Sequence, residues 1–77
     1  MIKMTLSEAL KLTRQKAFMT QDEFAKAIEV STLTVTRWEN GRCIPNLTAM
    51  KKIKQFCQSN EYPFDIIENE WLGIKSK

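Results

Sequence analysis

The stretch from Thr20 to Asn46 decides the fold of this 77-residue chain, and it reads TQDEFAKAIEVSTLTVTRWENGRCIPN. Its first four residues form a capping-box pattern, in which a threonine and a glutamate three positions later satisfy backbone amides at a helix start. Gly41 marks the end of a later helix, because glycine readily adopts the left-handed conformation that stops one. The stretch predicts two short helices, over about 20–28 and 32–40, joined by a very short connection.

Helix signals continue on both sides of this stretch. We expect a first helix over about 7–17, capped by Thr5 or Ser7, a fourth over about 47–57, and a last short helix ended by Gly73. No sustained alternation typical of strands appears, so the predicted fold class is all-α, a compact domain of four to five helices. Apolar residues at helical spacing are expected to face one core: Leu6, Leu10, Ala17, Phe24, Ala25, Ile28, Val30, Val35, Trp38, Leu47, Met50, Ile53 and Cys57.

Length and charge divide the chain into a basic domain and an acidic extension. Seventy-seven residues make one domain at most, and 43% of them are hydrophobic. Residues 1–60 carry ten basic and five acidic side chains, whereas residues 61–77 carry two and four. We therefore expect 1–60 to be the part that meets a polyanion. The helical extension over 61–77 either packs on the same domain or forms a dimer interface.

Residue types exclude several kinds of site. The chain has no histidine, and Cys43 and Cys57 stand fourteen positions apart, which excludes the usual zinc-finger spacing. We expect no metal and no cofactor. Without a histidine, a metal cluster or a phosphate-cradling glycine loop, an enzyme is not expected either. No apolar run approaches the ~20 residues of a membrane span and no signal segment is evident, so the expected location is cytoplasmic.

The exposed face of the helix over 32–40 differs from an ordinary solvated face. Solvated faces favour good helix formers such as glutamate and lysine. Here threonines, which have poor helix propensity, surround one arginine. Short hydroxyls let a helix approach a groove wall, leucine and threonine methyls can contact thymine methyls, and arginine can bind guanine O6 and N7. The candidate base-reading residues are Thr32, Leu33, Thr34, Thr36 and Arg37.

The same stretch resembles the Cro/CI-type helix-turn-helix family, the lambda-repressor-like or XRE-like DNA-binding domains. Gln21 at the start of the second helix, then WENG and a following proline, carry the resemblance, which extends upstream to Arg14 and downstream to Cys57. It implies roles at matching positions: base reading by Thr32, Leu33 and Arg37, phosphate contact by Gln21, Asn40 and Arg42, and a structural ion pair of Arg14 with Glu39. It also implies double-stranded DNA as the partner, commonly read by a homodimer on two half-sites.

Two positions depart from the family pattern. Phe18 stands where the family often has the glycine that ends the first helix, and Glu29 stands where the turn usually has glycine. A residue other than glycine in a left-handed conformation costs about 1 kcal/mol. These departures affect local turn geometry and leave the expected reading surface unchanged.

The sequence thus predicts a sequence-specific transcriptional regulator, a repressor, that reads the major groove with its third helix. Two alternatives stay open: an antitoxin that uses the same domain to bind DNA, and a protein-interaction adaptor that kept the fold and lost DNA binding. The apolar residues of the tail fit two interpretations equally, closure of the core or a dimer interface; they are Phe64, Ile66, Ile67, Trp71 and Leu72.

Overall fold

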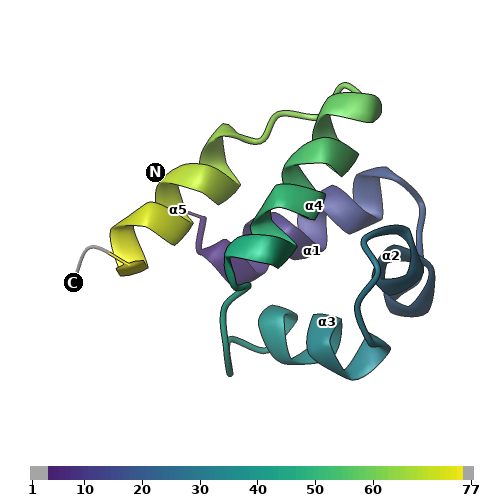
Figure 1. The fold of residues 1–77 in the computed structure, drawn as a ribbon, viewed down its shortest axis with the longest axis horizontal. Helices are drawn as coiled ribbons and strands as arrows, with labels where there is room; N and C mark the ends of the chain where they lie inside the picture. Colours follow the sequence, from purple (N-terminus) through teal and green to yellow (C-terminus); the bar gives the residue numbers. More distant parts are fainter. Residues whose placement is uncertain (1–3, 76–77) are drawn as a thin grey trace.

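Residues 4–75, which the computed structural model describes, form five α-helices joined by short turns (Figure 1). The helices are α1 (Leu6–Lys16), α2 (Gln21–Ala27), α3 (Thr32–Glu39), α4 (Leu47–Ser59) and α5 (Asp65–Lys75). The predicted all-α class is confirmed, and these described residues contain no strand. In Figure 1, α3 lies along the lower edge of the molecule and α5 lies at the left, with α4 between them.

The helix starts follow from side-chain caps. The hydroxyls of Thr5 and Thr20 each accept a hydrogen bond from the backbone amide three residues on. In both cases the residue at that position is a glutamate, whose carboxylate accepts a hydrogen bond from the backbone amide of the threonine. Ser31 caps α3 through the amide of Thr34 at 3.1 Å, and Asn46 caps α4. Each cap satisfies a backbone amide that has no partner inside its own helix. The short α2 and α3 therefore begin at fixed residues.

The first four helices end in the same way, with a left-handed residue one position beyond the cap. These residues are Phe18 (φ 56°), Glu29 (φ 60°), Gly41 (φ 74°) and Glu61 (φ 57°). After α2, for example, the amide of Val30 donates to the carbonyl of Ala25 at 2.9 Å, and the amide of Glu29 donates to that of Lys26. This pair of bonds is the Schellman motif. Three of the four ends thus use a residue other than glycine in a conformation that glycine adopts at lower cost.

One core joins all five helices. Its buried side chains include Leu10 of α1, Phe24 of α2, Trp38 of α3, Ile53 of α4 and Ile67 of α5. The ring of Phe24 meets that of Phe56 edge to face, with 5.2 Å between centroids. Because α3 is held by its buried Val35 and Trp38, its opposite face is left toward solvent.

The helix α5 packs against α1 and is tied to the rest of the domain by polar contacts. The indole Nε1 of Trp71 donates to the carbonyl of Pro45 at 2.6 Å, and the hydroxyl of Tyr62 donates to the carbonyl of Lys16 at 3.2 Å. Only one residue of α5, Ile67, is fully buried. Three large apolar residues of the helix stay exposed: Ile66, Leu72 and Ile74.

Four details of the sequence-based prediction were wrong. Leu47, expected in the core, is the first residue of α4 and has 60% of its surface exposed. Gly73 was expected to end the last helix, but α5 continues through it to Lys75. Ala17 and Val30, both expected inside, are half-buried, at the cap of α1 and in the turn after α2. Apolar residues near helix ends are the ones that helical spacing assigns least well.

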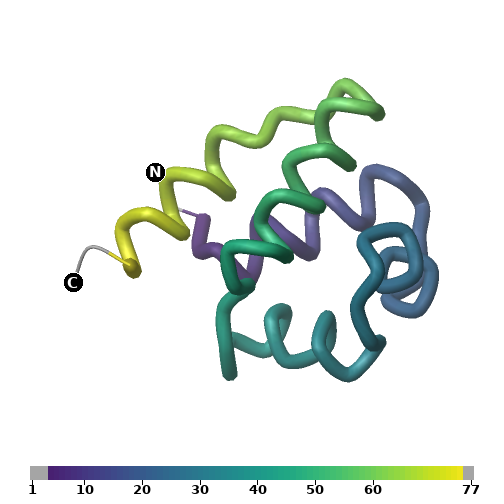
Figure 2. Tube along the Cα trace, viewed as in Figure 1, coloured from purple at the N-terminus to yellow at the C-terminus, as the bar shows by residue number. Residues whose placement is uncertain are grey.

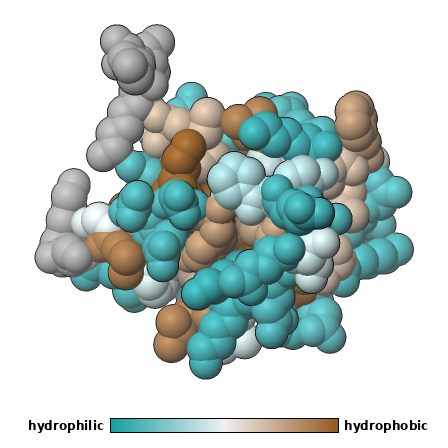
Figure 3. All heavy atoms as spheres, turned by 90° about the horizontal axis from the view of Figure 1, so that it is seen from above, coloured by the Kyte–Doolittle hydropathy of each residue, from teal (hydrophilic) through white to brown (hydrophobic). Residues whose placement is uncertain are grey.

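The surface is mixed in character. On the face shown in Figure 3, hydrophobic side chains lie in separate spots among hydrophilic ones. None of the helices in residues 4–75 is long and apolar enough to cross a membrane.

Candidate nucleic-acid interface

The helices α2 and α3 pack directly against each other across a turn of a few residues, which Figure 2 shows as a sharp change of direction. Ala25 is buried at this contact, and its carbonyl accepts the amide of Val30 from the turn. A small side chain here lets the two helix backbones approach closely. The arrangement is a helix-turn-helix unit, whose second helix is supported from behind and exposed in front.

A chain of polar side chains fixes α3 against α1 and α2. The Arg14 guanidinium of α1 forms a two-point ion pair with the Glu39 carboxylate of α3, through Nε at 2.7 Å and Nη2 at 2.9 Å. The amide nitrogen of Gln21 donates to the same carboxylate at 3.1 Å. The Glu39 hydrogen bond is the main reason that the pKa of Arg14 is raised. The structure thus brings together Arg14 and Glu39, the two residues expected to form a structural ion pair.

Two of the predicted base-reading residues project openly from α3. Leu33 has 56% of its surface exposed, and Arg37 is exposed one turn further along the helix. Among residues 4–75, the Arg37 guanidinium has no ion-pair or hydrogen-bond partner. An exposed arginine without a protein partner keeps all five N–H donors for another molecule. This cation therefore has the freedom that a base-edge contact needs.

The three threonines of α3 are half-buried, and each hydroxyl already contacts a protein group. Thr32 donates to Asp22 of α2 at 2.7 Å, and Thr36 donates to the Gln21 carbonyl oxygen at 2.8 Å. The hydroxyl of Thr34 lies 2.8 Å from that of Ser31. The sequence-based interpretation placed these threonines on the exposed face of the helix. The partners of Thr32 and Thr36 lie on α2, so helical spacing gave no sign of them, whereas Thr34 contacts the cap residue of its own helix.

The predicted phosphate-contact residues lie at the start of α2 and directly after α3. Gln21 begins α2 and is half-buried between Thr36 and Glu39, so one N–H of its amide is left over. Asn40 and Arg42 are exposed around Gly41, directly after α3. A Cβ on Gly41 would lie 3.5 Å from the hydroxyl oxygen of Ser7, so its left-handed backbone, rather than lack of space, favours glycine there.

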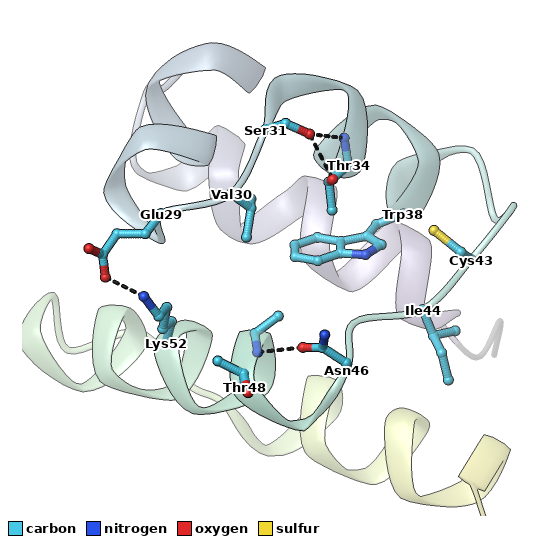
Figure 4. Close-up of a pocket in the computed structure, with 11 residues that line it drawn as sticks. Glu29, Val30, Ser31, Thr34, Trp38, Cys43, Ile44, Asn46, Thr48 and Lys52 are labelled. Atoms are coloured by element: carbon cyan, nitrogen blue, oxygen red, sulfur yellow. Dashed lines mark hydrogen bonds and ion pairs between the residues drawn. The ribbon is translucent and has the colours of Figure 1, made fainter.

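An open groove of about 480 Å³ lies beside α3, between the turn after α2 and the start of α4 (Figure 4). The indole of Trp38 forms its back, and an exposed ion pair of Lys52 with Glu29 stands at one end. The carboxylate of Glu29 has a lowered pKa, first because of the hydrogen bond from Lys52. The described residues contain no cluster of carboxylate or cysteine side chains able to hold a metal ion.

These features define a class of protein. A tight two-helix unit presents an exposed helix with an unpaired arginine, as helix-turn-helix DNA-binding domains do. Residues 10–61 match the helix-turn-helix family HTH_3, and the chain belongs to this family. The predicted resemblance is therefore confirmed. The family is one of DNA-binding domains rather than of enzymes.

The chain is also similar to the HTH-type transcriptional activator BcrR of Enterococcus faecalis, with 32% identity over 53 residues. The match covers 69% of this chain and 26% of that relative, so the chain spans about a quarter of the relative's length. No solved structure matches this chain.

Proposed function

We propose that this protein is a transcriptional repressor that binds double-stranded DNA in a sequence-specific manner, with α3 in the major groove. The observation that supports this proposal most directly is the division of α3 into two faces. Val35 and Trp38 are buried, whereas Leu33 and Arg37 on the other face are exposed. A helix held rigidly from behind presents its front residues at fixed positions, which base recognition requires.

Contacts to the phosphate backbone would set the register of α3 in the groove. Gln21 at the start of α2 lies beside Glu39 at the end of α3, and Asn40 and Arg42 follow directly after it. Phosphate contacts fix the orientation of a domain on the duplex, while other residues meet the base edges. In this proposal Thr32, Leu33 and Arg37 read bases, and Thr34 and Thr36 lie along the groove wall.

We further propose that the repressor acts as a homodimer. The longest axis of the domain extends 30 Å, slightly less than the ~34 Å that separates two half-sites one helical turn apart. Two copies on adjacent half-sites would therefore lie side by side. The exposed Ile66, Leu72 and Ile74 of α5 supply apolar surface of the kind found in dimer interfaces.

A second candidate function, transcriptional activation, is favoured by two observations. The relative described above is named as an activator. In addition, Phe18 in the turn before α2 has 94% of its surface exposed, and an exposed aromatic side chain is a common protein-contact residue. A reporter gene distinguishes the two: an operator placed across the promoter lowers expression for a repressor, and an operator placed upstream raises it for an activator.

The proposal is tested by selection of binders from a random duplex pool at near-physiological salt. Enrichment of an inverted repeat supports a sequence-specific dimer, and the repeat spacing measures the separation of the two copies of α3. Enrichment of a single asymmetric site supports sequence-specific DNA binding and contradicts the homodimer. No enrichment contradicts the proposal, and favours the adaptor or an antitoxin that binds DNA only with its partner.

A further inference from the structure

The hydrogen bond between Thr32 and Asp22 joins the first turn of the exposed helix to the first turn of α2. Thr32 is the first residue of α3, and its hydroxyl donates to the Asp22 carboxylate at 2.7 Å. The other carboxylate oxygen of Asp22 lies 3.2 Å from the ammonium group of Lys26, one turn further along α2. Both oxygens of Asp22 therefore have a partner within the protein.

This contact fixes the direction of the Thr32 hydroxyl. A hydroxyl has one hydrogen to donate, whereas an ionised carboxylate only accepts. The pKa of Asp22 is lowered, first by the bond from Thr32 and then by Lys26, so the group is ionised near neutral pH. The hydroxyl hydrogen of Thr32 bonds to Asp22, so the Thr32 hydroxyl can only accept a hydrogen bond from another molecule.

The bases differ in what they offer to such an oxygen. In the major groove, adenine N6 and cytosine N4 present N–H donors, whereas guanine and thymine present only acceptors at the corresponding positions. An oxygen that only accepts can bond to adenine or cytosine and opposes guanine or thymine. The methyl group of Thr32 is not affected by this restriction.

We propose that Asp22 is a specificity-determining residue, which holds the Thr32 hydroxyl as an acceptor and so makes α3 select adenine or cytosine at the base it faces. This inference rests on the proposed function of α3 as the reading helix. Asp22 itself acts through Thr32 as a positioning residue. At the start of the helix, the hydroxyls of the cap residue Ser31 and of Thr34 contact each other and either one can donate, so this contact does not fix their direction.

The experiment compares the sequences that the wild-type protein and three variants enrich from a random duplex pool. The wild type is expected to enrich adenine or cytosine at one position of each half-site. Asp22→Ala frees the Thr32 hydroxyl to donate, and should reduce that preference about tenfold, the loss of one base contact. Lys26→Ala is the matched control, because it removes the other partner of Asp22 and leaves the Thr32 bond in place; it should keep the preference.

A base analogue then tests the hydroxyl directly. Where the selected base is adenine, purine removes its amino group, and where it is cytosine, 2-pyrimidinone does the same. The analogue should weaken binding of the wild type about tenfold and leave binding of Thr32→Val nearly unchanged, because valine keeps the shape and lacks the oxygen. Circular dichroism checks that each variant is folded, which is expected because Asp22 takes no part in the Arg14–Glu39 pair.

The outcomes separate this inference from the proposed function. If the wild type enriches an operator and Asp22→Ala shows the same base preference in full, the role of Asp22 is overturned and the proposed function stands. If the wild type selects guanine or thymine at the base that Thr32 faces, and Thr32→Val loses that selection, the inference is overturned in the same way. Failure of the wild type to enrich any sequence overturns the proposed function, and this inference with it.

Discussion

The Glu39 carboxylate accepts hydrogen bonds from two nitrogens of Arg14 and from the side-chain amide of Gln21, so this single group joins α1, α2 and α3. The Arg14 nitrogens lie 2.7 and 2.9 Å from its two oxygens, and the remaining Arg14 amino group donates to the Met19 carbonyl at 2.9 Å. The two charged side chains are only 13% and 5% exposed. The position of α3 therefore depends on a buried polar contact as well as on apolar packing.

Glu39→Ala should strongly destabilise the protein, because it leaves the Arg14 guanidinium buried without its partner. Loss of one member of a buried ion pair costs about 3–5 kcal/mol. That loss is a large part of the total stability of about 4–12 kcal/mol expected for a chain of this length. Urea denaturation measures it. The control is Lys52→Ala, which removes the exposed pair with Glu29 and should cost below about 1 kcal/mol. Equal losses in the two variants would contradict the structural role of Glu39.

Arg37→Ala and Arg42→Ala should affect DNA binding in different ways. Arg37 lies on the exposed face of α3, and its loss should relax preference at one base pair by about 1–3 kcal/mol. Arg42 lies beyond the end of α3, and its loss should weaken binding to all sequences alike, with a salt slope shallower by about one. Titrations against matched and mismatched duplexes at several salt concentrations measure both effects. A uniform loss for Arg37→Ala would show that it binds phosphate.

Phe18→Gly should stabilise the fold by up to about 1 kcal/mol. Phe18 adopts φ 56° and is almost fully exposed, so glycine relieves the left-handed strain and removes little packing. Ala17→Gly is the matched control one residue earlier, where the backbone has φ −83°. That variant should destabilise, because glycine adds freedom to the unfolded chain without relieving strain. Thermal unfolding compares the two, and a lower midpoint for Phe18→Gly would show that the ring makes a contact worth more than the strain.

The stability of the protein should fall in acid. The pKa of Glu8 is lowered, first by the hydrogen bond from the Thr5 amide and then by the Thr5 hydroxyl. A carboxylate whose folded pKa lies below its unfolded value, about 4.3, contributes fully above that value and loses its contribution as pH falls through the folded pKa. Thermal midpoints should thus be level above about pH 5.5 and decline below about pH 4.5.

The variant Glu8→Gln isolates the share of the capping box in this decline. Glutamine keeps an oxygen that can accept the Thr5 amide, but it does not titrate. Its thermal midpoint should therefore depend less steeply on pH than that of the wild type. Parallel curves would show that Glu8 makes no contribution to the acid sensitivity.

The two cysteines should react at very different rates. Cys43 is exposed, whereas Cys57 is buried in the core and burial raises the pKa of its thiol to about 11. Because the thiolate is the reactive form, a disulfide reagent near neutral pH should label Cys43 quickly and Cys57 only on unfolding. Absorbance of the released thiol measures both phases. Cys43→Ser should remove the fast phase, and two equal rates in the wild type would contradict the burial of Cys57.

Sequence patterns predicted most of the fold because its signals are local. The capping box at Thr20 and the glycine at position 41 placed α2 and α3 to within a residue. Local patterns failed where neighbours from elsewhere in the chain decide: Leu47 has the right spacing for the core but 60% of its surface is exposed. The left-handed residue Glu61 also went unpredicted, since nothing in its side chain signals a helix end.

The same distinction between local and long-range signals applies to the candidate site. The sequence by itself determined which residues lie on α3, because helix caps and apolar spacing depend on residues within a few positions of one another. Only the tertiary structure decided what those residues do with their polar groups. Thr32 faces Asp22 and Thr36 faces Gln21 because α2 crosses α3, and bonds between residues 10 and 15 positions apart follow from that packing rather than from any local preference. The sequence thus named the residues of α3 that lie opposite its buried side, and the packing of two helices set the direction of the Thr32 and Thr36 hydroxyls.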